Sequence, residues 1–294
     1  MKKFNNEITG IFYMLIAQFS FATNDALVKL IYQNYSELLI LNQVIFIRGL
    51  FALLFMAAIL YYKKLLDFRT IFISKELNIR GFLEALACLF FFLGVATLPF
   101  AKVYILLSLA PIILTLFGII FFNEKVRWVR WGAIILGFSG VVVVINPAKL
   151  EYGFYFIFPL ISALALSLRD VYTKKMKSNF HSLQIAFITC FVVTIFFGVL
   201  SFYKFYSFSS FELLVLIVAS IFLSSGYIFA VATIKVAMVS TTSTFRYSVI
   251  IWGIVYGYFM FNEIPKLNTF IGGLMIIVSG LIIILREKQI GKIK

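Results

Sequence analysis

Charged residues are scarce in this 294-residue chain. Only 13% of its residues are charged, whereas 63% are hydrophobic, and the mean hydropathy is +1.04. A water-soluble domain carries about 25% charged residues. The composition therefore excludes a soluble globular protein and predicts a polytopic membrane protein.

Residues that build metal and redox centres are also sparse. The two cysteines, Cys88 and Cys190, lie inside apolar runs, and the single histidine, His181, has no Cys or His neighbour. This pattern argues against a disulfide framework and against a metal site. No Gly-x-x-x-x-Gly-Lys-[Ser/Thr] motif and no acidic cluster occurs, so we expect neither a cofactor nor nucleotide-driven pumping. An integral-membrane lipid-modifying enzyme is the less favoured alternative, and a channel is another.

Long apolar runs dominate the sequence instead. A helix needs ~20 apolar residues to cross the hydrocarbon core of a bilayer. The first run, from Ile8 to Ile31, is too long for the core of a cleavable signal and lacks a small-residue cleavage site. The period-two alternation of a β-barrel is absent. We predict an all-α membrane protein with ten transmembrane helices at residues 8–30, 38–61, 80–98, 101–121, 129–146, 153–174, 183–203, 210–233, 238–261 and 267–285.

The basic residues predict the orientation of these helices. Of the 26 Lys and Arg residues, 18 fall in segments on one side and five on the other, with three inside helices. Basic residues gather on the cytoplasmic side of membrane proteins, so both termini are expected in the cytoplasm. The net charge of +14 then indicates contact with anionic membrane lipids rather than nucleic acid.

The chain repeats itself. Phe122-Asn123-Glu124 returns as Phe261-Asn262-Glu263, and Ser139-Gly140 returns as Ser279-Gly280. These matches indicate two copies of one unit, residues 1–147 and 148–294. Five helices per copy is an odd number, so the second copy must be inserted upside down. A 5+5 inverted-topology repeat is typical of secondary transporters.

The same motifs resemble a known family. Leu109-Ala110-Pro111, Phe122-Asn123-Glu124, Arg130-Trp131-Gly132 and Gly137-Phe138-Ser139-Gly140 follow the order seen in EamA-type carriers of the drug/metabolite transporter superfamily. Thr23-Asn24-Asp25 with Lys29, and Phe245-Arg246-Tyr247, are further similar to the branch that contains bacterial S-adenosylmethionine uptake carriers. The resemblance implies a ten-helix carrier in the cell inner membrane, although members of one fold differ widely in substrate.

Ionisable residues inside the predicted helices are the first candidates for a substrate site. Each costs ~2.5–3.5 kcal/mol at a helix centre, so each one present needs a reason. Arg48, Glu84 and Arg246 are placed to line a polar cavity, where an arginine would bind a carboxylate and an acid would bind an amine or sulfonium, or carry a proton. The alternative is that such residues pair, as Arg48–Glu84, Arg246–Asp25 or Arg80–Glu84, and only fix the packing.

A polar pair recurs at the start of each copy. Asn24-Asp25 in the first helix corresponds to Arg169-Asp170 in the sixth, and the predicted topology puts them at opposite membrane faces. They are candidates for gating or coupling. Local ion pairs, Asp25–Lys29 and Asp170–Lys174, are the alternative, because residues four apart meet on one helix face.

Other polar and aromatic residues complete the candidate set. Asn42, with Gln43, could bond to substrate or between helices. Four aromatic residues could stack on a purine or hold an organic cation, although most aromatics here should pack between helices or face lipid: Tyr104, Tyr227, Tyr247 and Trp252.

Three further features are expected to be structural. The Asn-Glu pairs fit helix capping, and Pro111 should bend the fourth helix. The glycines of the fifth, ninth and tenth helices should allow close helix contact, and they also make a homodimer conceivable. The sequence thus predicts a secondary carrier that moves a small organic metabolite by alternating access, driven by a proton or by exchange. An exporter of drugs or amino acids is the alternative.

Overall fold

The computed structural model describes residues 2–35, 37–65, 72–122, 128–146, 152–176, 180–236 and 243–289. Every regular element in these ranges is helical, as the composition predicts. In chain order the elements are α1 (Lys2–Tyr32), α2 (Ile40–Tyr62), α4 (Lys75–Thr97), α5 (Phe100–Leu107), α6 (Ala110–Phe122), α7 (Trp128–Ile145), the 3-10 helix η1 (Gly153–Phe156), α8 (Ile157–Lys175), α9 (Ser182–Ser201), α10 (Ser210–Val236), the 3-10 helix η2 (Ser243–Tyr247), α12 (Ser248–Phe261) and α13 (Leu267–Gln289).

Eight helical segments of the described chain are long and apolar enough to cross a membrane. Two shorter apolar segments, 131–145 and 245–261, coincide with the predicted fifth and ninth helices. All ten predicted runs therefore contain a helix. The predicted start of the ninth run, residues 238–242, lies outside the described residues.

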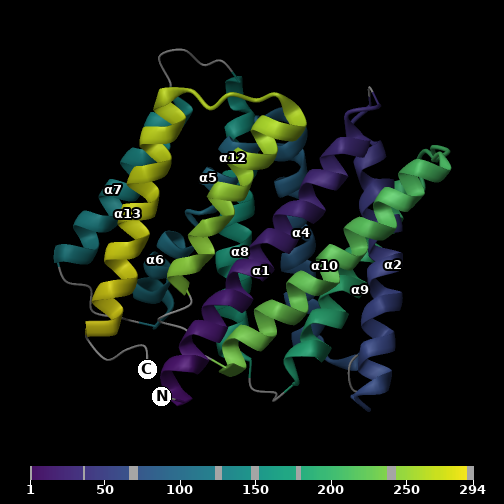
Figure 1. The fold of residues 1–294 in the computed structure, drawn as a ribbon, viewed down its shortest axis with the longest axis horizontal. Helices are drawn as coiled ribbons and strands as arrows, with labels where there is room; N and C mark the ends of the chain where they lie inside the picture. Colours follow the sequence, from purple (N-terminus) through teal and green to yellow (C-terminus); the bar gives the residue numbers. More distant parts are fainter. Residues whose placement is uncertain are drawn as a thin grey trace.

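The helix pairs follow one pattern across the two sequence copies. α7 packs on α13, α2 on α9 and α5 on α12, so three pairs join helices that occupy the same place in each copy. The first helix of each copy packs on the third helix of the other copy: α1 packs on α10, and α8 packs on α4. In Figure 1, α7 and α13 lie side by side on the left, and α2 and α9 on the right. A two-fold operation that exchanges the copies would reproduce this set of contacts.

Glycines bring α7 and α13 into close contact. A Cβ atom on Gly140 would lie 2.8 Å from the Gly272 carbonyl oxygen, and one on Gly272 would lie 2.5 Å from that of Gly140. The Ser279 hydroxyl donates a hydrogen bond of 2.5 Å to the Ala133 carbonyl across the same contact. The predicted close approach is thus confirmed, and it joins the two halves of one chain. The homodimer stays a prediction.

The fourth helix of the first copy is broken rather than bent. α5 ends at Leu107 and α6 begins at Ala110, next to Pro111, which has no N–H to donate to the preceding turn. The hydroxyl of Ser167 on α8 donates a hydrogen bond to the Ala110 carbonyl at the start of α6, 2.9 Å away. In the second copy the 3-10 helix η2 precedes α12 at the corresponding place. Interrupted helices of this kind commonly surround transporter binding sites.

Candidate functional site

Four polar side chains meet in the interior between α1, α2 and α5. Asp25 accepts a 2.6 Å hydrogen bond from the Tyr104 hydroxyl and a 2.8 Å bond from the Asn24 amide. The Asn24 amide oxygen accepts from Arg48 at 3.3 Å. We call these four residues the central cluster. All four were predicted as site or gating residues, and the structure brings them together.

Arg48 is held in place without having all its donors used. Its side chain is 4% exposed and lies over the Phe92 ring, 5.3 Å from the ring centre. Its Nε atom is buried and has no hydrogen-bond partner among the described residues. Cys88 on α4 lies within electrostatic range of both Arg48 and Asp25. A buried guanidinium N–H without an acceptor can donate a hydrogen bond to an oxygen of a bound ligand.

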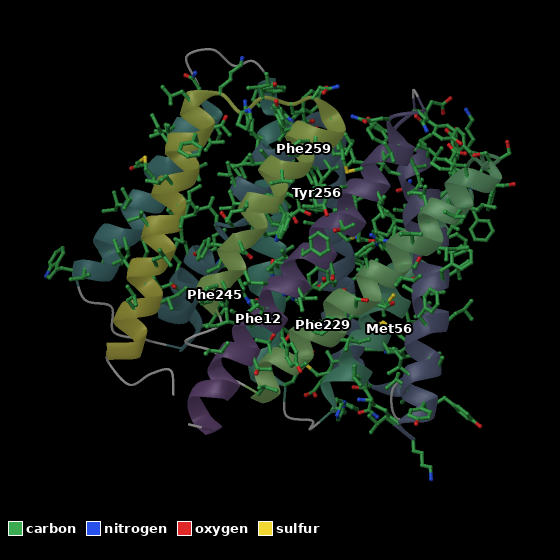
Figure 2. The ribbon with its side chains drawn as sticks, in the orientation of Figure 1. Phe12, Met56, Phe229, Phe245, Tyr256 and Phe259 are labelled. Carbon is green, nitrogen blue, oxygen red and sulfur yellow. The ribbon has the colours of Figure 1, made fainter. Side chains whose placement is uncertain are left out.

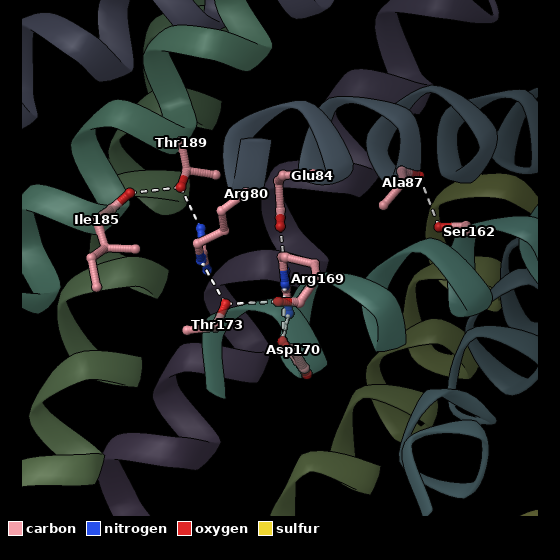
Figure 3. Close-up of polar contacts among 9 residues, drawn as sticks. All are labelled: Arg80, Glu84, Ala87, Ser162, Arg169, Asp170, Thr173, Ile185 and Thr189. Carbon is pink, nitrogen blue, oxygen red and sulfur yellow. Dashed lines mark hydrogen bonds and ion pairs between the residues drawn. The ribbon is translucent and has the colours of Figure 1, made fainter. Parts of the chain in front are cut away.

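A second cluster ties α4, α8 and α9 together (Figure 3). Arg169 forms ion pairs with Glu84 on α4 and with its own neighbour Asp170, at 2.7 Å for the latter. Arg80 donates to the Thr173 and Thr189 hydroxyls, the former at 3.1 Å. We call the following residues the second cluster: Arg80, Glu84, Arg169, Asp170, Thr173 and Thr189.

The two clusters lie toward different ends of the bundle. Asp25 is in the last third of α1, whereas Arg169 and Asp170 are near the end of α8 and Arg80 is near the start of α4. The start of α1 and the end of α13 lie at the same end of the bundle, the lower end in Figure 1. Since α8 ends and α4 begins at this lower end, the second cluster lies nearer to it than the central cluster does.

A third set of charges lies toward the opposite end. Lys29 on α1 is 4% exposed and pairs with Glu263 at 2.6 Å. The second oxygen of Glu263 accepts from the Phe100 backbone N–H at the start of α5, and the Lys29 ammonium lies 4.6 Å from the centre of the Phe261 ring. Asn262 ends α12 in the left-handed conformation, with φ of 53°. The capping role expected for this Asn-Glu pair is therefore confirmed, and Glu263 caps α5. The corresponding pair Asn123-Glu124 lies outside the described residues.

Two of the three local ion pairs considered as alternatives, Asp25–Lys29 and Arg80–Glu84, are not found among the described contacts. Lys29 pairs with Glu263 instead of with Asp25, and Glu84 pairs with Arg169 instead of with Arg80. Asp170 bonds to Arg169, while the Lys174 side chain lies outside the described residues. The described contacts also lack the long-range pairs that were considered: Arg48–Glu84 and Arg246–Asp25.

An aromatic group lies beside the central cluster, where α12 packs on α1. Trp252 contacts Phe19 edge-on at 4.8 Å and lies 6.4 Å from Tyr256. The Tyr256 and Thr23 hydroxyls are 2.5 Å apart. Figure 2 labels Tyr256 midway along α12. Trp252 was predicted, whereas Tyr256 and Thr23 were missed, although Thr23 precedes the predicted Asn24-Asp25 pair.

The remaining predicted residues divide between packing and surface. Tyr227 packs edge-on against Phe21 at 5.4 Å. Tyr247 is buried against Gly280, where any added Cβ would overlap its hydroxyl. Asn42 is half-buried and its side chain has no hydrogen bond to a described residue, while its neighbour Gln43 bonds both ways to the Tyr206 backbone.

Arg246 lies apart from the central cluster. It sits on η2, is exposed, and is within electrostatic range of Asp170 in the second cluster. The described contacts place Arg246 near Asp170 and give it no contact with Arg48, so a cavity lined by both arginines stays a prediction.

Comparison with known proteins identifies the class of this molecule. The profile of the EamA-like transporter family matches twice, at residues 8–146 and at residues 153–286. The chain belongs to this family. The double match agrees with the internal repeat, and the family consists of transporters, so the chain is a transporter and not an enzyme. It is a multi-pass protein of the inner membrane.

Several relatives cover nearly the whole chain. An S-adenosylmethionine uptake transporter of Rickettsia conorii is 26% identical over 96% of this chain and 94% of its own length. A pseudopaline exporter of Pseudomonas aeruginosa is 23% identical over 92% of this chain and 94% of its own length. A solved crystal structure matches with a TM-score of 0.61 over 98% of this chain and 100% of its own, at 14% identity, and shares the fold.

Proposed function

We propose that this transporter is a secondary carrier that moves an amino-acid-like metabolite, of the S-adenosylmethionine type, by alternating access. The observation that carries the proposal is the central cluster. Considering the described residues, it offers a buried guanidinium whose Nε donor has no partner and a carboxylate without a direct ionic partner in the membrane interior. Interior charges that are not paired directly are costly, and in membrane proteins they mark transport paths.

The arrangement of the helices supports alternating access. α1 runs away from the lower end of the bundle in Figure 1, and α8, its counterpart, runs toward it. We infer an inverted-topology repeat with both termini in the cytoplasm, in agreement with the distribution of basic residues. In such a design the two halves rock about a site between them.

Two sets of ion pairs fit the role of gates. The Lys29–Glu263 pair joins α1 to α5 and α12 at one end, and the Arg169–Glu84 pair joins α8 to α4 toward the other. Opening either end would require separating one set while the other stays closed. The predicted gating residues Asn24 and Asp25 then belong to the binding cluster, and Arg169 and Asp170 to a gate.

The substrate's carboxylate would bind to Arg48 and its ammonium to Asp25. Phe19, Trp252 and Tyr256 would contact a planar ring next to them. The names of the Rickettsia relatives favour an S-adenosylmethionine-like substrate and uptake. The pseudopaline exporter relative favours export as the alternative direction.

Counterflow in liposomes tests the proposal. Purified protein in liposomes loaded with S-adenosylmethionine should accumulate the labelled compound from outside, with a rate that saturates. Glu37→Gln, at an exposed pair outside the clusters, serves as a matched control and should keep the rate. Flux that rises linearly with concentration would contradict a carrier. Carrier kinetics with other amino-acid-like compounds but none with S-adenosylmethionine would contradict the substrate.

A further inference from the structure

Each set of charges that meets in the described interior has as many positive as negative side chains, with Arg80 counted in the second cluster, but the sets differ in whether opposite charges contact directly. Lys29 contacts Glu263 directly, and Arg169 contacts both of its carboxylate partners directly. Arg48 and Asp25 also carry one charge of each sign, yet the link between them is the Asn24 amide. The central cluster is therefore a neutral ion pair held open by one amide.

This separation leaves each ion able to accept a further partner. Within the described part of the chain, the buried Nε donor of Arg48 has no partner, and the half-buried Asp25 bonds only to the neutral groups of Tyr104 and Asn24. A directly bonded pair would have to be broken before it could bind a ligand ion, at a cost of several kcal/mol in the interior. The open pair does not carry that cost.

Building on the proposed function, we propose that the central cluster selects a zwitterionic α-amino-acid head group and moves it without a coupled proton. The empty site is neutral, and a carboxylate on Arg48 together with an ammonium on Asp25 adds no net charge. With a substrate that has no other charge, such as S-adenosylhomocysteine, the loaded and the empty carrier can therefore both change conformation without an uncompensated charge at this cluster. A ligand that carries the carboxylate alone would leave the site negative unless a proton bound to Asp25.

The neighbours of Asp25 support this charge balance. The helices packed on α1 are α2, α4, α10, α12 and η2. Toward the cluster they present Arg48 from α2 and Cys88 from α4, and α5 adds Tyr104 with Tyr256 of α12 beside it. Thiols and phenols are uncharged at neutral pH, so Arg48 is the charge that faces Asp25. From α10, Tyr227 lies within electrostatic range of the second cluster, and the charge of Arg246 on η2 acts on Asp170.

Two probes that differ in the charge of the head group test the proposal in proteoliposomes. S-adenosylhomocysteine has a zwitterionic head group, and its N-acetyl derivative keeps the carboxylate but loses the ammonium. We expect uptake of the first to be the same with and without an imposed pH gradient. We expect the second to enter at least ~10-fold more slowly, a factor of ten being about 1.4 kcal/mol, and to be accelerated by an acidic outside.

Changing the charge of the site should change the preference. Asp25→Asn leaves Arg48 unbalanced, so the ratio of N-acetyl to zwitterionic uptake should rise at least ~10-fold. Asp170→Asn, at the corresponding position of the second copy, is the matched control and should leave this ratio at the wild-type value whatever its total rate. A purely structural role for Asp25 would lower the uptake of both probes equally.

The outcomes separate this inference from the proposed function. Proton-driven accumulation of S-adenosylhomocysteine by the wild-type protein, or an unchanged ratio in Asp25→Asn, would overturn the inference and leave the carrier intact. Absence of counterflow with every probe, including S-adenosylmethionine, would overturn the proposed function and this inference with it.

Discussion

The central cluster and the second cluster are built from the same kinds of residue but are connected differently. In the second cluster Arg169 contacts Glu84 and Asp170 directly, whereas in the central cluster the Asn24 amide separates Arg48 from Asp25. Asn24-Asp25 and Arg169-Asp170 occupy corresponding places in the two sequence copies. The first residue of this pair is Asn24 in one copy and Arg169 in the other. With asparagine the opposite charges are separated by an amide, an open pair, whereas with arginine they contact directly, a closed pair. The closed pair should serve stability and gating, and the open pair should serve binding.

The largest effect should follow from Arg169→Ala. This change leaves two carboxylates, Glu84 and Asp170, without their cation in a low-dielectric interior. Removing one partner of a fully buried pair costs about 3–5 kcal/mol, and because these side chains are 16–31% exposed we expect a loss near the lower end of that range. We expect a clear fall in the melting temperature of the purified protein, measured by thermal unfolding in detergent. A melting temperature equal to that of the wild type would show that the second cluster contributes no stability.

Arg48→Gln should show the opposite balance between stability and transport. Asp25 keeps its bonds to Tyr104 and Asn24, so we expect a stability change within about 1 kcal/mol. Loss of a charged hydrogen bond to the substrate carboxylate, about 1.5–3 kcal/mol, should raise the concentration for half-maximal counterflow at least ~10-fold. Arg48→Lys keeps the charge but loses the planar donor geometry, so its concentration for half-maximal counterflow should lie between those of the wild type and Arg48→Gln. If Arg48→Gln lowers the melting temperature as much as Arg169→Ala does, the two clusters do not differ in their contribution to stability.

Much of the fold could be read from local sequence patterns. Apolar runs reveal helices wherever they lie, Pro111 breaks a helix through its own missing N–H, and Asn262 caps α12 through its own backbone. These properties depend on a few neighbouring residues. The repeated Phe-Asn-Glu motif likewise needs only comparison of the sequence with itself.

The partners inside the site could not be read in this way. The partner of Glu84 is Arg169, 85 residues away, and not Arg80 one turn back; that of Lys29 is Glu263, 234 residues away. Which pair forms depends on the rotation of each helix about its axis and on which helix it packs against. Hydrophobic periodicity is too weak to fix that rotation when every face of a helix is apolar. The sequence therefore supplied the charged residues but not their connections.

The Lys29–Glu263 pair should give a smaller effect than the second cluster, because Glu263 keeps a second partner, the Phe100 N–H. We expect Lys29→Met and Glu263→Gln each to destabilise the protein by about 1–3 kcal/mol. In the double variant the losses should not add, leaving a coupling energy of at least about 0.5 kcal/mol. Thermal unfolding of the four proteins measures the cycle. Additive losses would mean that the two side chains do not act as a pair.

The smallest effect should come from an ion pair outside the spans. Glu37 bonds to Lys204 at 2.7 Å and to the Tyr206 hydroxyl, and the bond to Lys204 is the main cause that lowers the pKa of Glu37 below its usual 4.5. A carboxyl with a lowered pKa stabilises the folded state above its unfolded pKa, and the contribution is lost as pH falls through the folded value. The two side chains are 47% (Lys204) and 44% (Glu37) exposed, so solvent screens the pair, and Glu37→Gln should lower the melting temperature only slightly at pH 7 and by less still below about pH 4. A difference that grew on acidification would contradict the sign of this shift. A large difference at pH 7 would show that an exposed, directly bonded ion pair stabilises the protein as much as the interior pairs do. Direct contact between charges would then not explain why the two clusters are expected to have different roles.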